Sequence, residues 1–143
     1  MLEVITCFLG TVGFCVILNV SKRKLFYSVF GGLISSVLLA LLTELGAETF
    51  KAVFISMLVI SIYSEVLSRI TKTPANIILL PASIPLLPGG SLYYMMSFLV
   101  HFDRQNFVFY AKETALTGLG IALGAVVISI IVKIINSRKC QSE

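Results

Sequence analysis

The segment 79–96, LLPASIPLLPGGSLYYMM, decides how this chain can fold. It places Pro81, Pro85 and Pro88, followed by Gly89 and Gly90, in one of the most apolar regions of the sequence. A proline inside a helix donates no amide hydrogen and leaves the carbonyl four residues earlier without its usual partner. Three prolines so close together, followed by two glycines, disfavour one continuous helix. We therefore expect two half-helices, the first from about 76 to 80 and the second from about 90 to 100.

The composition is that of an integral membrane protein. Of the 143 residues, 57% are hydrophobic and 13% are charged, whereas soluble domains have about 25% charged residues. The net charge of +4 comes from short basic clusters between the apolar segments, which is typical of topology signals. Zinc-finger spacing and basic helices with interleaved aromatic residues are both missing from the sequence, so we do not expect a nucleic-acid partner.

Apolar segments long enough to cross a hydrocarbon core of about 30 Å as helices recur along the chain. The predicted spans cover residues 2–20, 26–43, 49–70, 76–100 and 113–135. They lack the alternation of barrel strands. The first lacks the basic start and small-residue cleavage site of a signal peptide, so we expect it to be retained. The predicted fold class is an all-α integral membrane protein, a single transmembrane domain over residues 1–143, with five helices of which the fourth is broken.

Basic residues predict the orientation. If all five segments cross, eight basic residues lie on one side: Lys22, Arg23, Lys24, Arg69, Lys72, Lys133, Arg138 and Lys139. The other side receives Lys51, Arg104 and Lys112. Because basic residues favour the cytoplasmic side, we expect a multi-pass protein of the inner or plasma membrane with its N-terminus outside and its C-terminus in the cytoplasm. This assignment requires segment 76–100 to cross.

The broken segment also suggests a function. Unpaired backbone groups facing lipid cost several kcal/mol each, so a break near the bilayer middle must be packed in protein or line a watery cavity. Transporters use discontinuous helices to place helix ends at a midplane site, and an amino-terminal helix end suits a carboxylate. A kinked packing helix with small residues is the alternative interpretation. The candidate substrate-binding residues are Asn19, Ser83, Pro85, Pro88, Gly89, Gly90, Ser91, Tyr93 and Tyr94.

The stretch 74–96, PANIILLPASIPLLPGGSLYYMM, resembles the signature of the threonine/serine exporter family, in particular its short, YjjB-like subunits. The family pattern has a proline at the cytoplasmic start, then I-P-x-x-P-G, then a tyrosine and a methionine. The matching residues are Pro74, Ile84, Pro85, Pro88, Gly89, Tyr93 or Tyr94, and Met96. The segments 12–20, 54–69 and 114–127 are similar as well, so the resemblance covers nearly the whole chain.

The resemblance implies a function. Members of the family export threonine and serine, some two-component relatives are implicated in succinate export, and transport is thought to draw on the proton motive force. Short members work beside a larger subunit with five further helices and a cytoplasmic region. The chain is therefore expected to be a small exporter subunit in membrane lipid, with a small-molecule substrate and no cofactor. A structural or assembly subunit without its own transport path is the alternative.

Two polar residues near span ends have two interpretations each. Glu65 is a candidate for proton coupling or gating, because carboxylates inside membrane segments are usually functional. Its spacing from Arg69 equally fits an i,i+4 ion pair near the interface. Asn19 ends the first span, where it could line the transport path or bond to a neighbouring helix.

The remaining motifs predict packing rather than chemistry. The glycines of GLGIALG (118–124) and FGGLISS (30–36) have the spacing of close helix contacts. His101 stands alone, so no metal site is expected, and the spacing of Cys7, Cys15 and Cys140 implies no disulfide framework. An enzyme is disfavoured because Glu65 and His101 lie on opposite predicted sides and no serine has an evident base.

Overall fold

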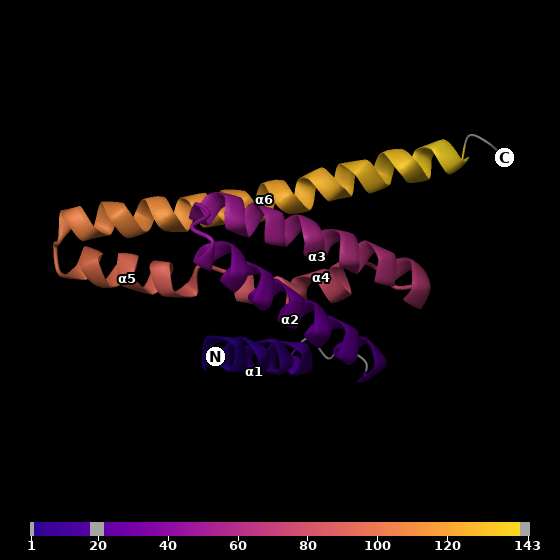
Figure 1. The fold of residues 1–143 in the computed structure, drawn as a ribbon, viewed down its shortest axis with the longest axis horizontal. Coiled ribbons are helices and arrows are strands. Elements are labelled where there is room, and N and C mark those ends of the chain that lie inside the picture. The colour runs from indigo at the N-terminus through magenta and orange to yellow at the C-terminus, as the bar shows by residue number, and fades with distance from the viewer. Residues whose placement is uncertain (1, 18–21, 141–143) are drawn as a thin grey trace.

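The computed structural model describes residues 2–17 and 22–140, and every secondary-structure element in this part of the chain is a helix, as the sequence predicts (Figure 1). The elements are α1 (Leu2–Ile17), α2 (Lys22–Glu44), α3 (Thr49–Thr71), α4 (Asn76–Ala82), the short 3₁₀ helix η1 (Ile84–Leu86), α5 (Gly89–Val100) and α6 (Arg104–Cys140).

Among the described residues, three helices are long and apolar enough to cross a membrane, and a bent pair makes a fourth candidate. The three are Leu25–Glu44, Thr49–Thr71 and Arg104–Ile135, and the pair joins α4 to Ile84–Val100 with a bend of 42°. The five predicted spans are thus not confirmed. The described helix α1 has 16 residues, fewer than the roughly 20 that a span needs, and the predicted end of that span lies outside the described residues.

The predicted break in the fourth segment is confirmed, but the predicted loop after it is not. The region 101–113 was expected to connect two spans, yet α6 begins at Arg104. Asp103 caps this helix with two hydrogen bonds. Its Oδ1 accepts one from the backbone amide of Asn106 at 3.3 Å, and its Oδ2 accepts one from the Asn106 side-chain Nδ2 at 2.8 Å. Because Asp is a strong amino-terminal cap, the helix starts nine residues before the predicted span.

Helix α2 packs against α1, α3 and α4. A Cβ atom at Gly31 would lie 3.0 Å from the Cβ of Ala82 and 3.0 Å from the ring of Tyr63. A Cβ atom at Gly32 would lie 2.8 Å from the Thr11 side chain. The predicted packing role of these two glycines is therefore confirmed, since a larger residue would force the neighbouring helices apart.

The contact between α3 and α6 depends on glycine in the same way. A Cβ atom at Gly124 would lie 2.8 Å from Met57 Cβ, and one at Gly120 would lie 3.3 Å from the Phe50 carbonyl oxygen. A Cβ atom at Gly118 would meet nothing within 4 Å. Gly120 and Gly124 therefore form the predicted close-packing motif, and Gly118 takes no part in it.

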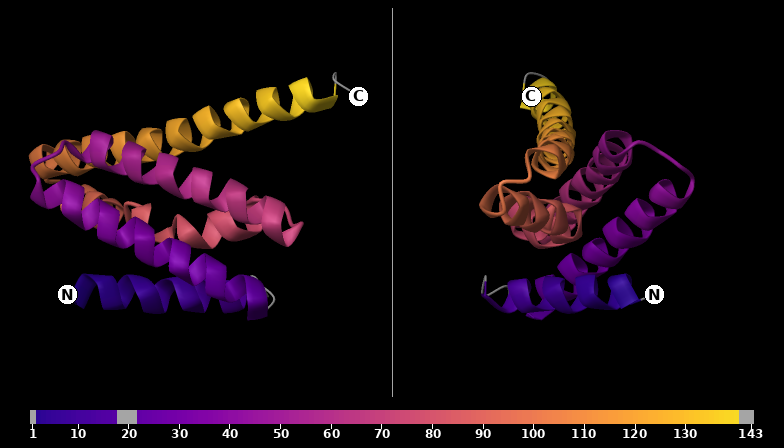
Figure 2. Two further views of the ribbon diagram at one scale, coloured as in Figure 1. Left: turned by 45° about the vertical axis from the view of Figure 1, so that its right-hand side comes forward. Right: turned by 90° about the vertical axis from the view of Figure 1, so that its left-hand side faces the viewer.

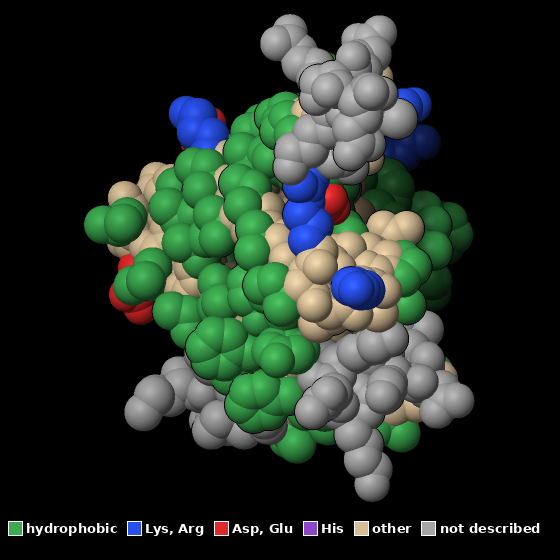
Figure 3. All heavy atoms as spheres, turned by 90° about the vertical axis from the view of Figure 1, so that its right-hand side faces the viewer, with side chains coloured by type: hydrophobic (Ala, Val, Ile, Leu, Met, Phe, Trp, Pro, Cys, Tyr) green, Lys and Arg blue, Asp and Glu red, His purple; other side chains and the backbone are tan. Residues whose placement is uncertain are grey.

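The start of α2, the end of α3 and the end of α6 lie at one end of the molecule (Figures 1 and 2). Figure 3 views this end, where Lys and Arg side chains stand among hydrophobic ones. At the opposite end, α5 and the first turns of α6 lie side by side and reach beyond the turn that joins α2 to α3 (Figure 1).

Candidate functional site

The interruption between α4 and α5 has two steps. Helix α4 closes with the Ser83 amide donating to the Leu79 carbonyl oxygen at 2.9 Å. The η1 turn follows, and in it the Leu87 amide donates to the Ile84 carbonyl oxygen at 3.1 Å. Leu87 itself is extended, with φ −66° and ψ 133°, as expected for a residue before proline. Pro88 then precedes the first residue of α5.

Ser35 of α2 stabilises the first step of the interruption. Its hydroxyl lies 3.0 Å from the Ala82 carbonyl oxygen and 2.8 Å from the Gly32 carbonyl oxygen, and both Ser35 and Ala82 are fully buried. The end of α4 is therefore packed in protein near the middle of α2, where an unpaired carbonyl would be costly. This contact of Ser35 was not predicted, although a serine among small helix residues is a signal for such a contact.

The start of α5 is open. A Cβ atom at Gly89 or Gly90 would meet nothing within 4 Å. The Gly89 amide donates to the Leu87 carbonyl oxygen at 2.8 Å, whereas no acceptor for the amides of Gly90 and Ser91 is found in the described part of the chain. Along the long axis α5 begins about where α2 ends (Figure 1). The start of α5, which carries the glycine pair, thus lies near the level at which α2 ends, and the depth of the break in a bilayer stays a prediction.

Helix α5 packs along the first turns of α6, and none of its side chains is fully buried. The Ser91 hydroxyl donates to Glu113 Oε2 at 3.2 Å. The Tyr110 ring lies 5.3 Å from the Tyr94 ring and 5.5 Å from the Phe98 ring. Two of the predicted site residues, Ser91 and Tyr94, therefore contact α6. Glu113 was missed, although an acid in the first turns of an apolar run is a recognisable signal.

Other predicted residues lie apart from this contact. The Ser83 hydroxyl donates to the Leu80 carbonyl oxygen of its own helix at 2.9 Å. Pro85 lies in η1, and the Tyr93 side chain is 70% exposed. Asn19 lies outside the described residues. The structure therefore separates Ser83 and Pro85, at the first step of the interruption, from the group formed by Pro88 to Tyr94.

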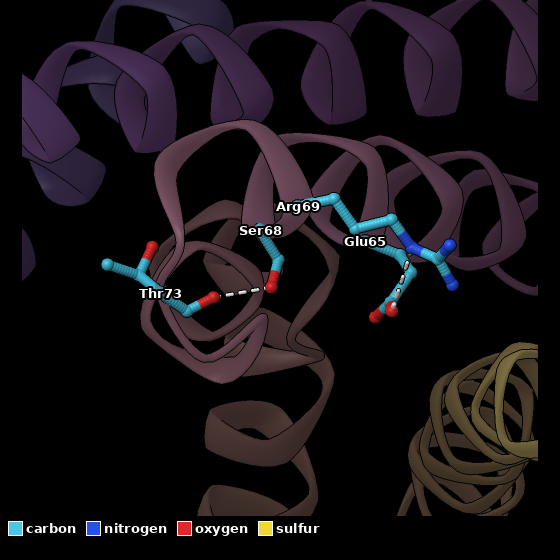
Figure 4. Close-up of polar contacts among 4 residues, drawn as sticks. All are labelled: Glu65, Ser68, Arg69 and Thr73. Carbon is cyan, nitrogen blue, oxygen red and sulfur yellow. Dashed lines mark hydrogen bonds and ion pairs between the residues drawn. The ribbon is translucent and has the colours of Figure 1, made fainter. Parts of the chain in front are cut away.

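Glu65 lies near the end of α3 in an ion pair (Figure 4). Arg69 Nε is 3.8 Å from Glu65 Oε1, as the ion-pair interpretation of the sequence predicts. Nearby, the Ser68 hydroxyl donates to the Thr73 carbonyl oxygen, and Lys72 ends the helix in a left-handed conformation with φ 51°. This end of α3 is therefore organised by local contacts.

A hollow of about 340 Å³ opens where α5 turns into α6. It is lined by Phe98, Leu99, Phe102, Asp103, Arg104 and Phe107. The hydrogen bonds from Asn106 hold the pKa of Asp103 below its ordinary value, because they stabilise the charged carboxylate. Within residues 2–17 and 22–140, no three His, Cys, Asp or Glu side chains gather to hold a metal ion.

A comparison with known protein families matches residues 3–131 to the model of the Threonine/Serine exporter, ThrE. No curated protein and no solved structure matches the chain. The family match spans most of the chain, from α1 through most of α6, and includes the interrupted segment between α4 and α5. The chain therefore belongs to the threonine/serine exporter family.

Proposed function

We propose that the chain is the small subunit of a membrane exporter for small polar amino or carboxylic acids. The observation that carries this proposal is the interrupted segment with its open glycine pair, in a chain of the exporter family. Threonine and serine are the first substrates to test, and succinate-like dicarboxylates are the second. The proton motive force drives export, and no enzymatic step is involved.

The start of α5 binds the substrate carboxylate. The amides of Gly90 and Ser91 are donors with no acceptor among the described residues, and the missing side chains of Gly89 and Gly90 leave room for a ligand to reach the backbone. The positive end of the helix dipole adds to this attraction. The remaining predicted residues, Asn19, Ser83, Pro85, Pro88, Tyr93 and Tyr94, shape the path around this point.

The exporter is completed by a larger subunit with five further helices and a cytoplasmic region. Helix α5 has one substantial neighbour in the described structure, α6, which leaves its other faces available to such a partner. The basic residues orient the assembly in the inner or plasma membrane, with the N-terminus outside and the C-terminus in the cytoplasm.

An assembly subunit without its own transport path is the second candidate. The observation that favours it is the small number of candidate spans in the described part of the chain, three or four. In that case the larger subunit alone would contain the complete path, and the present chain would only stabilise it.

The two candidates differ in an efflux experiment. Cells loaded with radiolabelled threonine, serine or succinate are compared when they express both subunits, either subunit or neither. We expect efflux only with both subunits, and we expect Gly90→Ala to lower efflux while the complex still assembles. Efflux by the larger subunit alone would support the assembly role, and efflux unaffected by deletion of both subunits would contradict the proposed function.

A further inference from the structure

We propose that Glu113, and not Glu65, is the carboxylate whose protonation couples proton movement to transport, and that it acts by releasing Ser91 at the start of α5. The inference rests on the proposed function, since it names the coupling residue of that transport step. It makes Glu113 a positioning residue for the substrate site.

The geometry joins the two helices at the open end of α5. Glu113 Oε2 accepts a hydrogen bond from the Ser91 hydroxyl at 3.2 Å, and this contact is partly buried. Ser91 directly follows the glycine pair at the start of α5, and Glu113 belongs to the apolar stretch Arg104–Ile135 of α6. A carboxylate in such a stretch is a functional candidate by default.

Glu113 takes part in no ion pair within the part of the chain that the structure describes. In the described residues, the ion pairs are Lys51–Glu48 at 3.0 Å and Arg69–Glu65 at 3.8 Å, and none includes Glu113. Glu65, the other acid considered for coupling, is therefore paired with Arg69 within its own helix. The Glu113 carboxylate instead accepts a hydrogen bond from the Ser91 hydroxyl, and a partly buried carboxylate needs such a donor.

Protonation changes what Glu113 can do. An ionised carboxylate only accepts hydrogen bonds, whereas the protonated acid has an O–H group that donates and a weaker acceptor for Ser91. A proton taken from the aqueous phase on one side therefore loosens the start of α5, and its release to the other side restores the contact. The Tyr110 ring still contacts Tyr94 and Phe98, which lie one and two turns after Ser91 in α5. The part that loosens is therefore the amino-terminal turn of α5.

Other groups near this contact titrate or carry charge, and the experiment has to separate them from Glu113. These groups belong to α5, to α6, to the start of α3 and to the end of α5: Tyr93, Tyr94, Tyr110, Lys112, Glu48, Lys51 and His101. All of them are retained in a Glu113→Gln variant. Glu65→Gln and His101→Gln serve as controls, since His101 is the single histidine of the chain.

The test uses the complete exporter, with its larger subunit, in lipid vesicles. Two rates are measured for radiolabelled threonine: uptake driven by an imposed pH gradient, and exchange of internal for external threonine at equal pH. For Glu113→Gln we expect gradient-driven uptake to fall by about 5-fold or more, as for typical coupling free energies, while exchange stays within about 2-fold of the wild type. Glu65→Gln and His101→Gln should keep both rates.

Ser91→Ala provides a second, independent variant. Removal of the hydroxyl takes away a donor to the charged carboxylate. The pH profile of gradient-driven uptake should therefore move to higher pH, while coupling is retained. An unchanged profile in Ser91→Ala would overturn the proposal even if Glu113→Gln failed to fold.

The remaining outcomes separate the two levels of the proposal. Gradient-driven uptake that persists in Glu113→Gln would overturn the role of Glu113 and leave the exporter function intact. Equal loss of uptake and exchange in a folded Glu113→Gln protein would also overturn it, because a purely structural role predicts that result. A wild-type exporter that moves no amino acid or dicarboxylate would contradict the proposed function itself.

Discussion

The hydroxyl of Ser35 in α2 donates to the carbonyl oxygen of Ala82, 3.0 Å away, at the point where α4 ends. We predict that Ser35→Ala lowers the free energy of unfolding by about 1–3 kcal/mol, because it leaves a buried carbonyl without a donor. Ser36→Ala is the matched control, since the Ser36 hydroxyl donates to the Leu33 carbonyl oxygen of its own helix. Thermal and denaturant unfolding in mild detergent measure the difference, and equal losses in the two variants would contradict this role of Ser35.

The α3–α6 interface predicts opposite effects for two nearby glycines. Gly124→Ala should destabilise the protein by about 1–3 kcal/mol, because the new Cβ overlaps Met57. Gly118→Ala should be neutral or stabilising by up to about 1 kcal/mol, since the added Cβ meets open space in a helix. The free energies of unfolding of the two variants test the assignment, and a tolerated Gly124→Ala would mean that the two helices separate without cost.

The glycine pair at the start of α5 predicts a loss of transport without a loss of stability. A Cβ atom at Gly90 would meet nothing within 4 Å, so Gly90→Ala should leave the unfolding free energy unchanged or raise it by up to about 1 kcal/mol. If a substrate approaches this backbone, threonine efflux should nevertheless fall below that of Gly118→Ala. Normal efflux by a stable Gly90→Ala protein would remove Gly90 from the site.

The cap of α6 predicts a local dependence on pH. Hydrogen bonds from the Asn106 side chain and then from its backbone amide lower the pKa of Asp103. A lowered pKa in the folded state means that the cap stabilises the helix start above the ordinary carboxyl value of about 3.9 and is lost as the pH falls below it. Asn106→Ala should raise the pKa of Asp103 toward that value, which NMR titration of the carboxyl carbon would detect. An unchanged titration would contradict the cap.

The sequence predicted the interruption well because prolines act locally. Pro85 and Pro88 remove amide donors wherever they stand, so the end of α4 and the start of α5 follow from residue identity. The helix-contact glycines 120 and 124 were found for a similar reason, since their spacing places both on one face. The position of Gly90 along the bundle was not predictable in this way, because it depends on the path that η1 and Leu87 take between α4 and α5.

The partners of the polar residues were harder to predict. Glu65 and Arg69 pair within one helix, and their spacing of four residues already indicated the contact. The contacts Ser35–Ala82 and Ser91–Glu113 join different helices, so no spacing in the sequence encodes them. The early start of α6 was missed for a different reason: the apolar pattern marks where a span can begin, whereas the Asp103 cap decides where the helix begins.

Helix α5 has one substantial neighbour in the described structure, α6, and we expect this to determine which helix unfolds first. Helix α2 packs against α1, α3, α4 and η1, whereas α5 is held to α6 in the described structure by the Ser91–Glu113 hydrogen bond and stacked rings. Segments with few packed contacts open at the lowest free energy. Amide hydrogens of α5 should therefore exchange with solvent while those of α2 are still protected, and the α5 half of the fourth segment should detach without disturbing the rest.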